Sequence, residues 1–318
     1  MSTFQPLAVA RALTRGRAGA GRTEAARESA AAYVFLAPWL IGLVGLTLGP
    51  MIASLALSFT HFDLLSAPRW VGLHNYELLL QDDRYLKSVR VTLTYVLLEV
   101  PLKLAFAMLL AVLLNRGLAA VGLYRALFYV PSLLGGSAAI AILWRQIFSY
   151  NGMLNLVLNT AGWQNPPAWL QDPGYALYTL VLLGIWQFGS PMVIFLAGLR
   201  QIPRELYEAA KVDGARALSQ FLRITLPLLT PLILFNFILQ MVYAFQTFTP
   251  AFLVSGGSGG PVDSTLFYTL YLYSEAFGNL RMGYGAAMAW ILLIVIAAVT
   301  AVIFWSQRYW VFYMEAER

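Results

Sequence analysis

The sequence predicts an all-α membrane protein with six transmembrane helices. Of its 318 residues, 59% are hydrophobic and only 11% are charged, which is more apolar surface than a soluble domain of this length buries. Six apolar runs reach the ~20 residues that a helix needs to cross a bilayer. Lys and Arg gather in alternate segments between the runs, as is typical of polytopic membrane proteins. The six runs are residues 32–59, 89–114, 121–148, 175–199, 221–248 and 284–305.

The parts outside the runs divide the chain into three regions. Residues 1–31 are rich in Ala, Gly and Arg and have no apolar periodicity, so we expect a disordered tail. The membrane domain then covers residues 32–310, and 311–318 form a short C-terminal end. We expect no cleaved signal peptide, because the first apolar run is long enough to span the membrane.

The distribution of Lys and Arg predicts the orientation in the membrane. Positive charge lies in the N-terminal tail, in 115–125, in 200–223 and in the C-terminal end from 308, so these parts are predicted to be cytoplasmic. The three remaining connecting segments are predicted to face outward. Both termini then lie in the cytoplasm, as does the segment between the fourth and fifth spans.

Several kinds of site are excluded by composition and motif. The chain has no cysteine and its two histidines lie in one polar segment, so neither a thiolate nor a zinc site is expected. A nucleotide-binding P-loop motif is absent. The glycine-rich run at 255–261 follows an apolar run and precedes no helix start, which favours a flexible external loop.

The cytoplasmic segment at about 203–217 predicts a short charged helix followed by a turn. Pro203 suits a first helical position, and Gly214 can end the helix in a left-handed conformation. Asp213 is expected to cap the helix that follows, and Glu208 is expected to point outward. The apolar positions share one helix face: Leu206, Ala209 and Ala210.

Two opposite charges lie one helical turn apart within the second run. Glu99 and Lys103 flank Pro101, and an ionisable group at this depth costs at least a few kcal/mol unless it is paired or solvated. The favoured interpretation is a self-neutralising pair that faces the helix bundle and supports a kinked helix. The alternative is that the pair forms the wall of a hydrated substrate path.

Polar residues form a stripe along the fifth run. Such a stripe should face the interior, either to hydrogen-bond a neighbouring helix or to meet a hydroxyl-rich ligand, and both interpretations remain open. In the fourth run, Trp186 and Gln187 precede a Gly-Ser-Pro helix break, and broken helices often border a transport pathway. The stripe comprises Asn236, Gln240, Tyr243, Gln246 and Thr247.

The charged segment also carries a family resemblance. Glu208-Ala209-Ala210, then Asp213-Gly214-Ala215, with Pro227 and Pro231 downstream, resembles the "EAA" signature of permease subunits in binding-protein-dependent ABC importers. The resemblance continues over nearly the whole chain after the tail, and it is strongest with the carbohydrate branch. More narrowly, the chain is similar to the first permease of oligosaccharide and glycerol-3-phosphate importers. Segments that carry this similarity include 33–38, 71–76 and 203–207.

The resemblance implies a type I ABC importer permease with a coupling helix between spans four and five. The coupling residues would be Glu208, Ala209, Ala210, Asp213 and Gly214. The implied partners are a second homologous permease, two ATPase subunits that hold ATP and magnesium, and an extracytoplasmic solute-binding protein that docks on the outer loops. The implied cargo is a sugar, and the implied location is a bacterial cytoplasmic membrane. No cofactor bound by this chain itself is implied.

Other functions fit the residues less well. An ion-coupled secondary carrier should have repeated halves and several acids placed for ion coupling, whereas Glu99 is the one acid in mid-span. An intramembrane enzyme would need paired catalytic acids, a His cluster or an activated Ser. Within the importer class a phosphorylated cargo such as glycerol-3-phosphate stays open, because Lys103 or Arg145 could compensate a phosphate.

Overall fold

The structure is a computed structural model that describes residues 32–115 and 121–312. It divides into two units, Met1–Leu57 and Ser58–Arg318. The predicted first span is present as the helical segment Ala32–Ser58, which is a π-helix between Leu43 and Leu48 and continues as α2 (Gly49–Ser58). The predicted tail at 1–31 and most of the predicted C-terminal end lie outside the described residues.

The five other predicted spans lie in the second unit. Three are continuous: α4 (Asp83–Leu114), the segment Ala217–Phe245 and α15 (Met282–Trp310). The third span is a pair, α5 (Val121–Leu134) and α6 (Ala138–Ile147), bent by 96°. The fourth is a pair bent by 41°, α8 (Ala176–Trp186) and α9 (Gly189–Leu199). With each bent pair counted as one span, all six predicted spans are found.

The bend in the third span was not predicted. It falls at the sequence Gly135-Gly136-Ser137, just after Pro131, where two glycines weaken the helix. The Ser137 hydroxyl then accepts a hydrogen bond from the backbone N–H of Ile140, at 3.4 Å. Such an N-cap lets α6 start in a new direction.

Helix α4 begins six residues before the apolar run. The Asp82 carboxylate accepts hydrogen bonds from the backbone N–H groups of Arg84 (3.0 Å) and Tyr85 (3.2 Å). These bonds satisfy donors that have no partner within the helix. The cap therefore extends the helix through a charged turn that hydropathy alone assigns to a loop.

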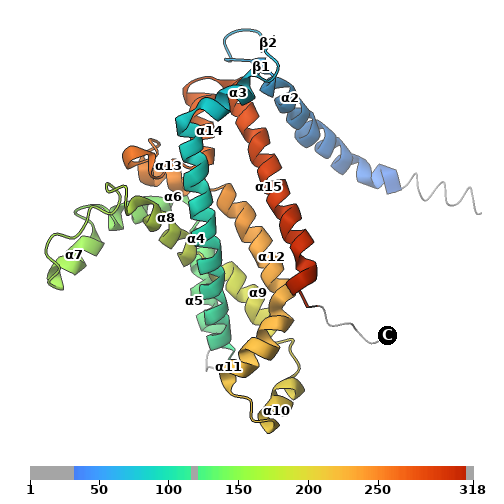
Figure 1. Ribbon diagram of the computed structural model, residues 1–318, viewed down its shortest axis with the longest axis vertical. Coiled ribbons are helices and arrows are strands. Elements are labelled where there is room, and N and C mark those ends of the chain that lie inside the picture. Colours follow the sequence, from blue (N-terminus) through green and yellow to red (C-terminus); the bar gives the residue numbers. More distant parts are fainter. Residues whose placement is uncertain (1–31, 116–120, 313–318) are drawn as a thin grey trace, which may run out of the picture. The chain divides into compact units, whose positions relative to one another are not determined.

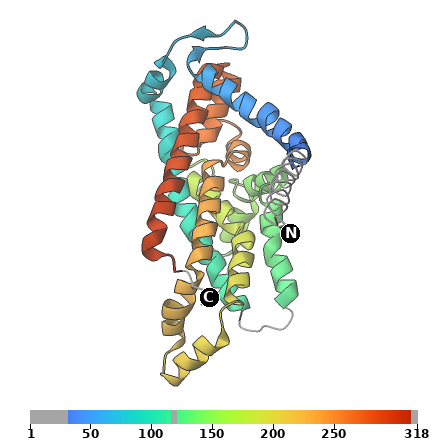
Figure 2. The ribbon, with the colours of Figure 1, turned by 90° about the vertical axis from the view of Figure 1, so that its right-hand side faces the viewer.

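Helix α4 is the centre of the packing in the second unit. It contacts α8, α9 and α14 (Tyr268–Tyr273), and it also contacts α12 (Leu226–Phe245), which in turn contacts α9 and α15. Figures 1 and 2 show α4, α12 and α15 running lengthwise beside one another. The Trp144 indole N–H donates to the carbonyl oxygen of Thr179 at 2.9 Å, which joins α6 to α8.

Short elements occupy the segments that were expected to be external loops. Strands β1 (Thr60–His61) and β2 (Arg69–Trp70) pair antiparallel, with Thr60 opposite Trp70. The Asn75 amide, on α3 (His74–Gln81), donates to the carbonyl oxygens of Ser58 and Thr60 at 2.8 and 2.9 Å. Later connecting segments contain α7 (Met153–Thr160), α13 (Thr249–Ser255), η3 (Pro261–Asp263), α14 (Tyr268–Tyr273) and η4 (Ser274–Gly278).

The segment between the fourth and fifth spans forms two short helices. These are α10 (Arg204–Val212) and α11 (Ala217–Gln220); α11 and the π-helical η2 (Phe221–Thr225) form the start of the span Ala217–Phe245 and lead into α12. Figure 1 shows α10 and α11 at the end of the second unit opposite to β1, β2 and α3. Gly214 has φ +75°, so the predicted left-handed turn is confirmed.

Two details of this segment were predicted wrongly. Pro203 is the N-cap residue of α10 and not its first helical residue. Asp213 does not cap α11, because the turn at Gly214 separates it from that helix. The N-cap residue of α11 is Arg216, three residues after Asp213, and its side chain makes no capping hydrogen bond.

Candidate functional site

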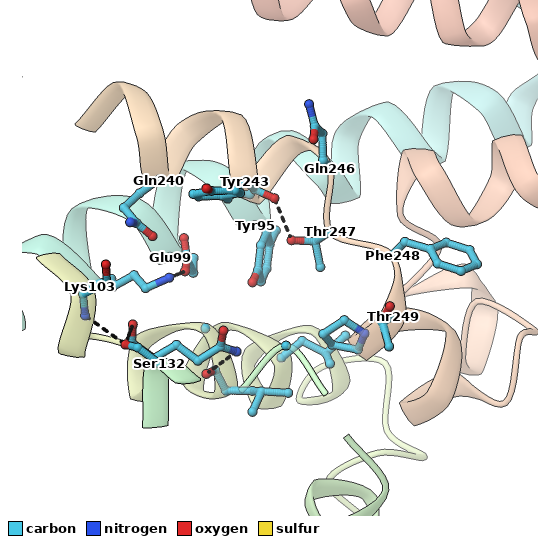
Figure 3. A pocket seen from close by; sticks show the side chains of 18 residues that line it. Tyr95, Glu99, Lys103, Ser132, Gln240, Tyr243, Gln246, Thr247, Phe248 and Thr249 are labelled. Carbon is cyan, nitrogen blue, oxygen red and sulfur yellow. Dashed lines mark hydrogen bonds and ion pairs between the residues drawn. The ribbon is translucent and has the colours of Figure 1, made fainter. Parts of the chain in front are cut away.

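A cavity of about 460 Å³ lies where α4, α5, α8 and α12 meet. This volume is within the range of small-molecule sites in proteins. Its walls combine amides, hydroxyls and aromatic rings with one acid and one base (Figure 3). The polar lining residues are Tyr95, Glu99, Lys103, Ser132, Gln187, Ser190, Gln240, Tyr243, Gln246, Thr247 and Thr249.

The acid and the base form an ion pair. The Lys103 Nζ donates to Glu99 Oε1 at 2.9 Å, and the two side chains are only 9% and 3% exposed. The i,i+4 spacing brings them together on one face of α4 in spite of Pro101 between them. Because the pair also lines the cavity, its geometry is compatible with both roles considered from the sequence.

Gly184 on α8 makes room for this pair. A Cβ atom at Gly184 would lie 2.5 Å from Glu99 Cγ and 2.7 Å from the Tyr95 hydroxyl oxygen, far inside van der Waals contact. Only a glycine therefore lets α8 approach α4 at this level. Sequence reasoning did not identify this residue, because the signal is a close approach between two helices that are distant in sequence.

The polar stripe of α12 divides into two parts. Gln240 and Tyr243 line the cavity, as do Gln246 and Thr247 just beyond the helix end. Asn236 is not among the lining residues: it is fully buried, and its amide donates to the carbonyl oxygen of Leu232 at 3.1 Å. The ligand interpretation thus has geometric support at four positions, whereas the bond of Asn236 stays within α12 and does not join it to a neighbouring helix.

The bends of the third and fourth spans meet beside the cavity. The Ser132 hydroxyl donates to the carbonyl oxygen of Gln187 at 2.8 Å and accepts from the backbone N–H of Ser190 at 3.0 Å. The Gln187 side chain donates to the carbonyl oxygen of Gly135 at 3.3 Å. Trp186 is not a lining residue, and its ring lies 6.2 Å from that of Trp144.

Four of the polar lining residues were missed from the sequence. Tyr95 could have been found, since it precedes Glu99 by one turn of the same helix face. Ser190 lies within the Gly-Ser-Pro break that was noted. Ser132 and Thr249 had no signal, because they reach the cavity only through the bend of the third span and the turn after α12.

A second polar cluster joins the start of α4 to α14 and α15. The Asp82 carboxylate accepts hydrogen bonds from the hydroxyls of Tyr271 and Tyr284, each at 2.6 Å. Burial opposes ionisation of Asp82, but these bonds and two backbone N–H groups outweigh it and lower its pKa. Burial and the Asp82 carboxylate raise the pKa of Tyr271. The cluster thus holds a partly buried carboxylate that accepts four hydrogen bonds.

The segment around α10 presents a mixed apolar and charged surface. No residue of α10 is buried, and Val212 and Leu206 are 89% and 41% exposed beside the exposed Glu208. The Tyr207 hydroxyl is hydrogen-bonded to that of Thr225 at 2.8 Å, which ties α10 to η2. Exposed apolar side chains on an anchored helix are typical of a protein contact.

No metal centre is found in the part of the chain that the structure describes. Among residues 32–115 and 121–312, no group of three or more His, Cys, Asp or Glu side chains could hold an ion.

Comparison with known proteins identifies similar chains over nearly the full length. Residues 84–312 match the family model described as "Binding-protein-dependent transport system inner membrane component". The probable ABC transporter permease protein YesP of Bacillus subtilis (strain 168) is 49% identical over 92% of this chain and 94% of its own length. The lactose transport system permease protein LacF of Rhizobium radiobacter is 30% identical over 87% of this chain and 93% of its own.

A solved structure shares the fold. A chain of a bacterial ABC transporter involved in the import of the acidic polysaccharide alginate superimposes with a TM-score of 0.77. The two chains are 21% identical, and the match covers 90% of this chain and 97% of the other.

Proposed function

Because the chain belongs to the binding-protein-dependent transport system inner membrane component family, and is a permease subunit of an ABC transporter and not an enzyme, we propose that it carries a sugar inward through the cavity beside α4. The proposed cargo is a di- or oligosaccharide, delivered by an extracytoplasmic binding protein and passed across by alternating access.

The lining of the cavity is the observation that carries this proposal. Gln187, Gln240 and Tyr243 offer amide groups and an aromatic ring, which suit the hydroxyls and the apolar faces of a sugar. The relative LacF is named for lactose transport, which supports the same class of cargo.

The coupling segment is proposed to transmit force from a separate ATPase subunit. Glu208, Ala209 and Ala210 on α10, with Asp213 and Gly214 at its end, would dock into that subunit, which holds ATP and magnesium. The exposed apolar side chains of α10 and its bond to η2 support this role. Movement of α10 would then pass through η2 into α12, which lines the cavity.

The remaining partners and the orientation complete the proposal. A second homologous permease would close the cavity opposite α12, and two ATPase subunits would lie on the cytoplasmic side. The Lys and Arg distribution supports cytoplasmic termini, and the α3 end would then face the binding protein. The position of α10 at the opposite end from α3 agrees with this orientation.

A phosphorylated cargo is less well supported. Lys103 is already paired with Glu99, and Arg145 lines a different pocket, near Tyr150 and Pro261. Of the described residues that line the 460 Å³ cavity, none is a cation that lacks an anionic partner. A phosphate at Lys103 would therefore also meet the Glu99 carboxylate. An ion-coupled carrier is not favoured, given the family.

Reconstitution tests the proposal directly. The chain would be co-purified with its partner permease and ATPases, placed in proteoliposomes, and supplied with the binding protein and a panel of labelled saccharides. We expect uptake of at least one di- or oligosaccharide that requires both ATP and the binding protein. Uptake of a polyol phosphate but of no saccharide would refute the proposal that the cargo is a sugar. Uptake driven by an ion gradient without ATP would refute the proposal that the transport is driven by ATP.

A further inference from the structure

The Glu99–Lys103 pair leaves hydrogen-bonding capacity on both partners. An ammonium group has three N–H donors, and within residues 32–115 and 121–312 Lys103 makes one hydrogen bond, to Glu99 Oε1. Glu99 Oε2 is buried and has no hydrogen-bond partner among the described residues. A buried acceptor without a partner is destabilising, because it has lost its bonds to water. The pair thus places an unused acceptor next to unused donors.

This capacity lies at the wall of the cavity. Both residues line it together with Tyr95 and Gln240 (Figure 3), and Gly184 provides the space that the pair occupies. The terminal torsion of a glutamate is soft. A rotation of the carboxylate can therefore bring Oε2 to the cavity while Lys103 Nζ keeps one carboxylate oxygen.

The charge of the wall decides what chemical group fits there. Of the described lining residues, Glu99 and Lys103 are the only charged ones, so the net charge of the wall is zero. An anionic group that reached Lys103 would lie within about 4 Å of the Glu99 carboxylate. Repulsion from Glu99 would then offset most of the attraction of the anion to Lys103. A hydroxyl avoids this cost, because it can donate to a carboxylate and accept from an ammonium group.

We propose that Glu99 and Lys103 form a clamp for two adjacent hydroxyl groups of the transported saccharide. One hydroxyl donates to Glu99 Oε2, and its neighbour accepts from Lys103 Nζ. The inference rests on the proposed function and narrows its cargo: the sugar unit at this wall carries a free vicinal diol, and any carboxylate or phosphate of the cargo lies elsewhere. The clamp supplies the partner that Oε2 lacks.

The test replaces the pair by an apolar one. In the E99M/K103M double variant no charge is stranded, and such replacements of buried pairs are often neutral for stability. The probes are the disaccharide that the wild-type complex takes up fastest, from a panel that includes lactose, and its monodeoxy analogues. Each is presented on saturating binding protein, so that maximal uptake rates compare the permease step.

The clamp predicts a specific pattern of rates. In the wild-type complex, removal of either of two adjacent hydroxyls lowers maximal uptake about tenfold, as expected for one hydrogen bond to a charged group. In E99M/K103M, uptake of the parent sugar falls about tenfold or more, and the analogues fall less than twofold further. Gln240→Ala serves as the matched control in the same cavity: it lowers uptake but keeps the tenfold discrimination at those two hydroxyls.

Three outcomes overturn the clamp. The first is an E99M/K103M complex that transports and discriminates like the wild type, which would make the pair structural only. The second is an absence of discrimination at any adjacent hydroxyl pair in the wild type. The third is a wild-type preference for an anionic analogue that is lost in K103M. A wild-type complex that takes up no saccharide would instead overturn the proposed function.

A second double variant tests the clamp if the E99M/K103M complex does not assemble. E99Q/K103Q keeps polar groups at both positions, and hydrogen bonds to neutral groups are roughly half as strong as those to charged ones. The discrimination should then fall from about tenfold to about threefold. Undiminished discrimination in this variant would contradict a role for the charges.

Discussion

Removal of one member of the Glu99–Lys103 pair should destabilise the protein far more than removal of both. Glu99→Gln leaves the Lys103 ammonium group, which is 9% exposed, without its anion, and Lys103→Gln leaves the carboxylate, which is 3% exposed. A charge stranded in this way costs about 3–5 kcal/mol. The Glu99→Gln, Lys103→Gln double variant strands no charge, and its two amides can still hydrogen-bond.

The size of the effect makes it measurable by thermal unfolding. For a chain of this size, 1 kcal/mol corresponds to a shift in melting temperature of about 2–4 °C. Each single variant should therefore melt on the order of 10 °C below the wild type, and the double variant should recover most of that loss. The assay is the fraction of monodisperse complex that survives heating in detergent, measured by size-exclusion chromatography.

A matched control distinguishes the effect of stranding a buried charge from the effect of a Glu→Gln substitution in general. Glu77 is exposed on α3, at the end of the second unit opposite to α10, so Glu77→Gln should shift stability by no more than about 0.5 kcal/mol. The reasoning is refuted if Glu99→Gln melts with the wild type, or if the double variant is no more stable than either single one.

Four further predictions follow from the same contacts. Glu208→Ala should leave assembly intact and lower uptake, and Gly214→Val should lower it further because φ is +75°; normal uptake in both would contradict the coupling role. Gly184→Ala should cost about 1–3 kcal/mol through overlap with Glu99, whereas Gly136→Ala, with nothing within 4 Å, should cost much less; equal melting temperatures would contradict this contact. Gln240→Ala should weaken uptake about fivefold, for a lost hydrogen bond of ~1 kcal/mol, and unchanged uptake kinetics would remove this residue from the pathway. Asp82→Asn should destabilise by about 1–2 kcal/mol at pH 7. Because the pKa of Asp82 is lower in the folded state than its ordinary value of 3.8, the stabilisation by the carboxylate is complete above pH 3.8. It is lost as the pH falls through the lower folded-state pKa. The gap in melting temperature between variant and wild type should therefore close in acid, and a gap independent of pH would contradict it.

The features that follow from the sequence alone are those decided within a few turns of one helix. Run length and apolar content predict the six spans, because each span must satisfy its own backbone hydrogen bonds in the bilayer. The left-handed turn at Gly214 depends on one residue's backbone freedom. The contact between Glu99 and Lys103 follows from their i,i+4 spacing on α4.

The tertiary structure decides which helix faces pack against each other and which of them line the cavity. Asn236 and Gln240 lie one turn apart in a stripe on α12, yet only Gln240 lines the cavity. The hydrogen bonds of Ser132 with Gln187 and Ser190 join two bends that are more than 50 residues apart. Hydropathy and helical period specify how a helix is formed and which residues share a face, but the neighbour that a face meets depends on side-chain volumes and hydrogen bonds contributed by the other helices. The cavity is therefore a property of the packed bundle, and its charged pair a property of one helix.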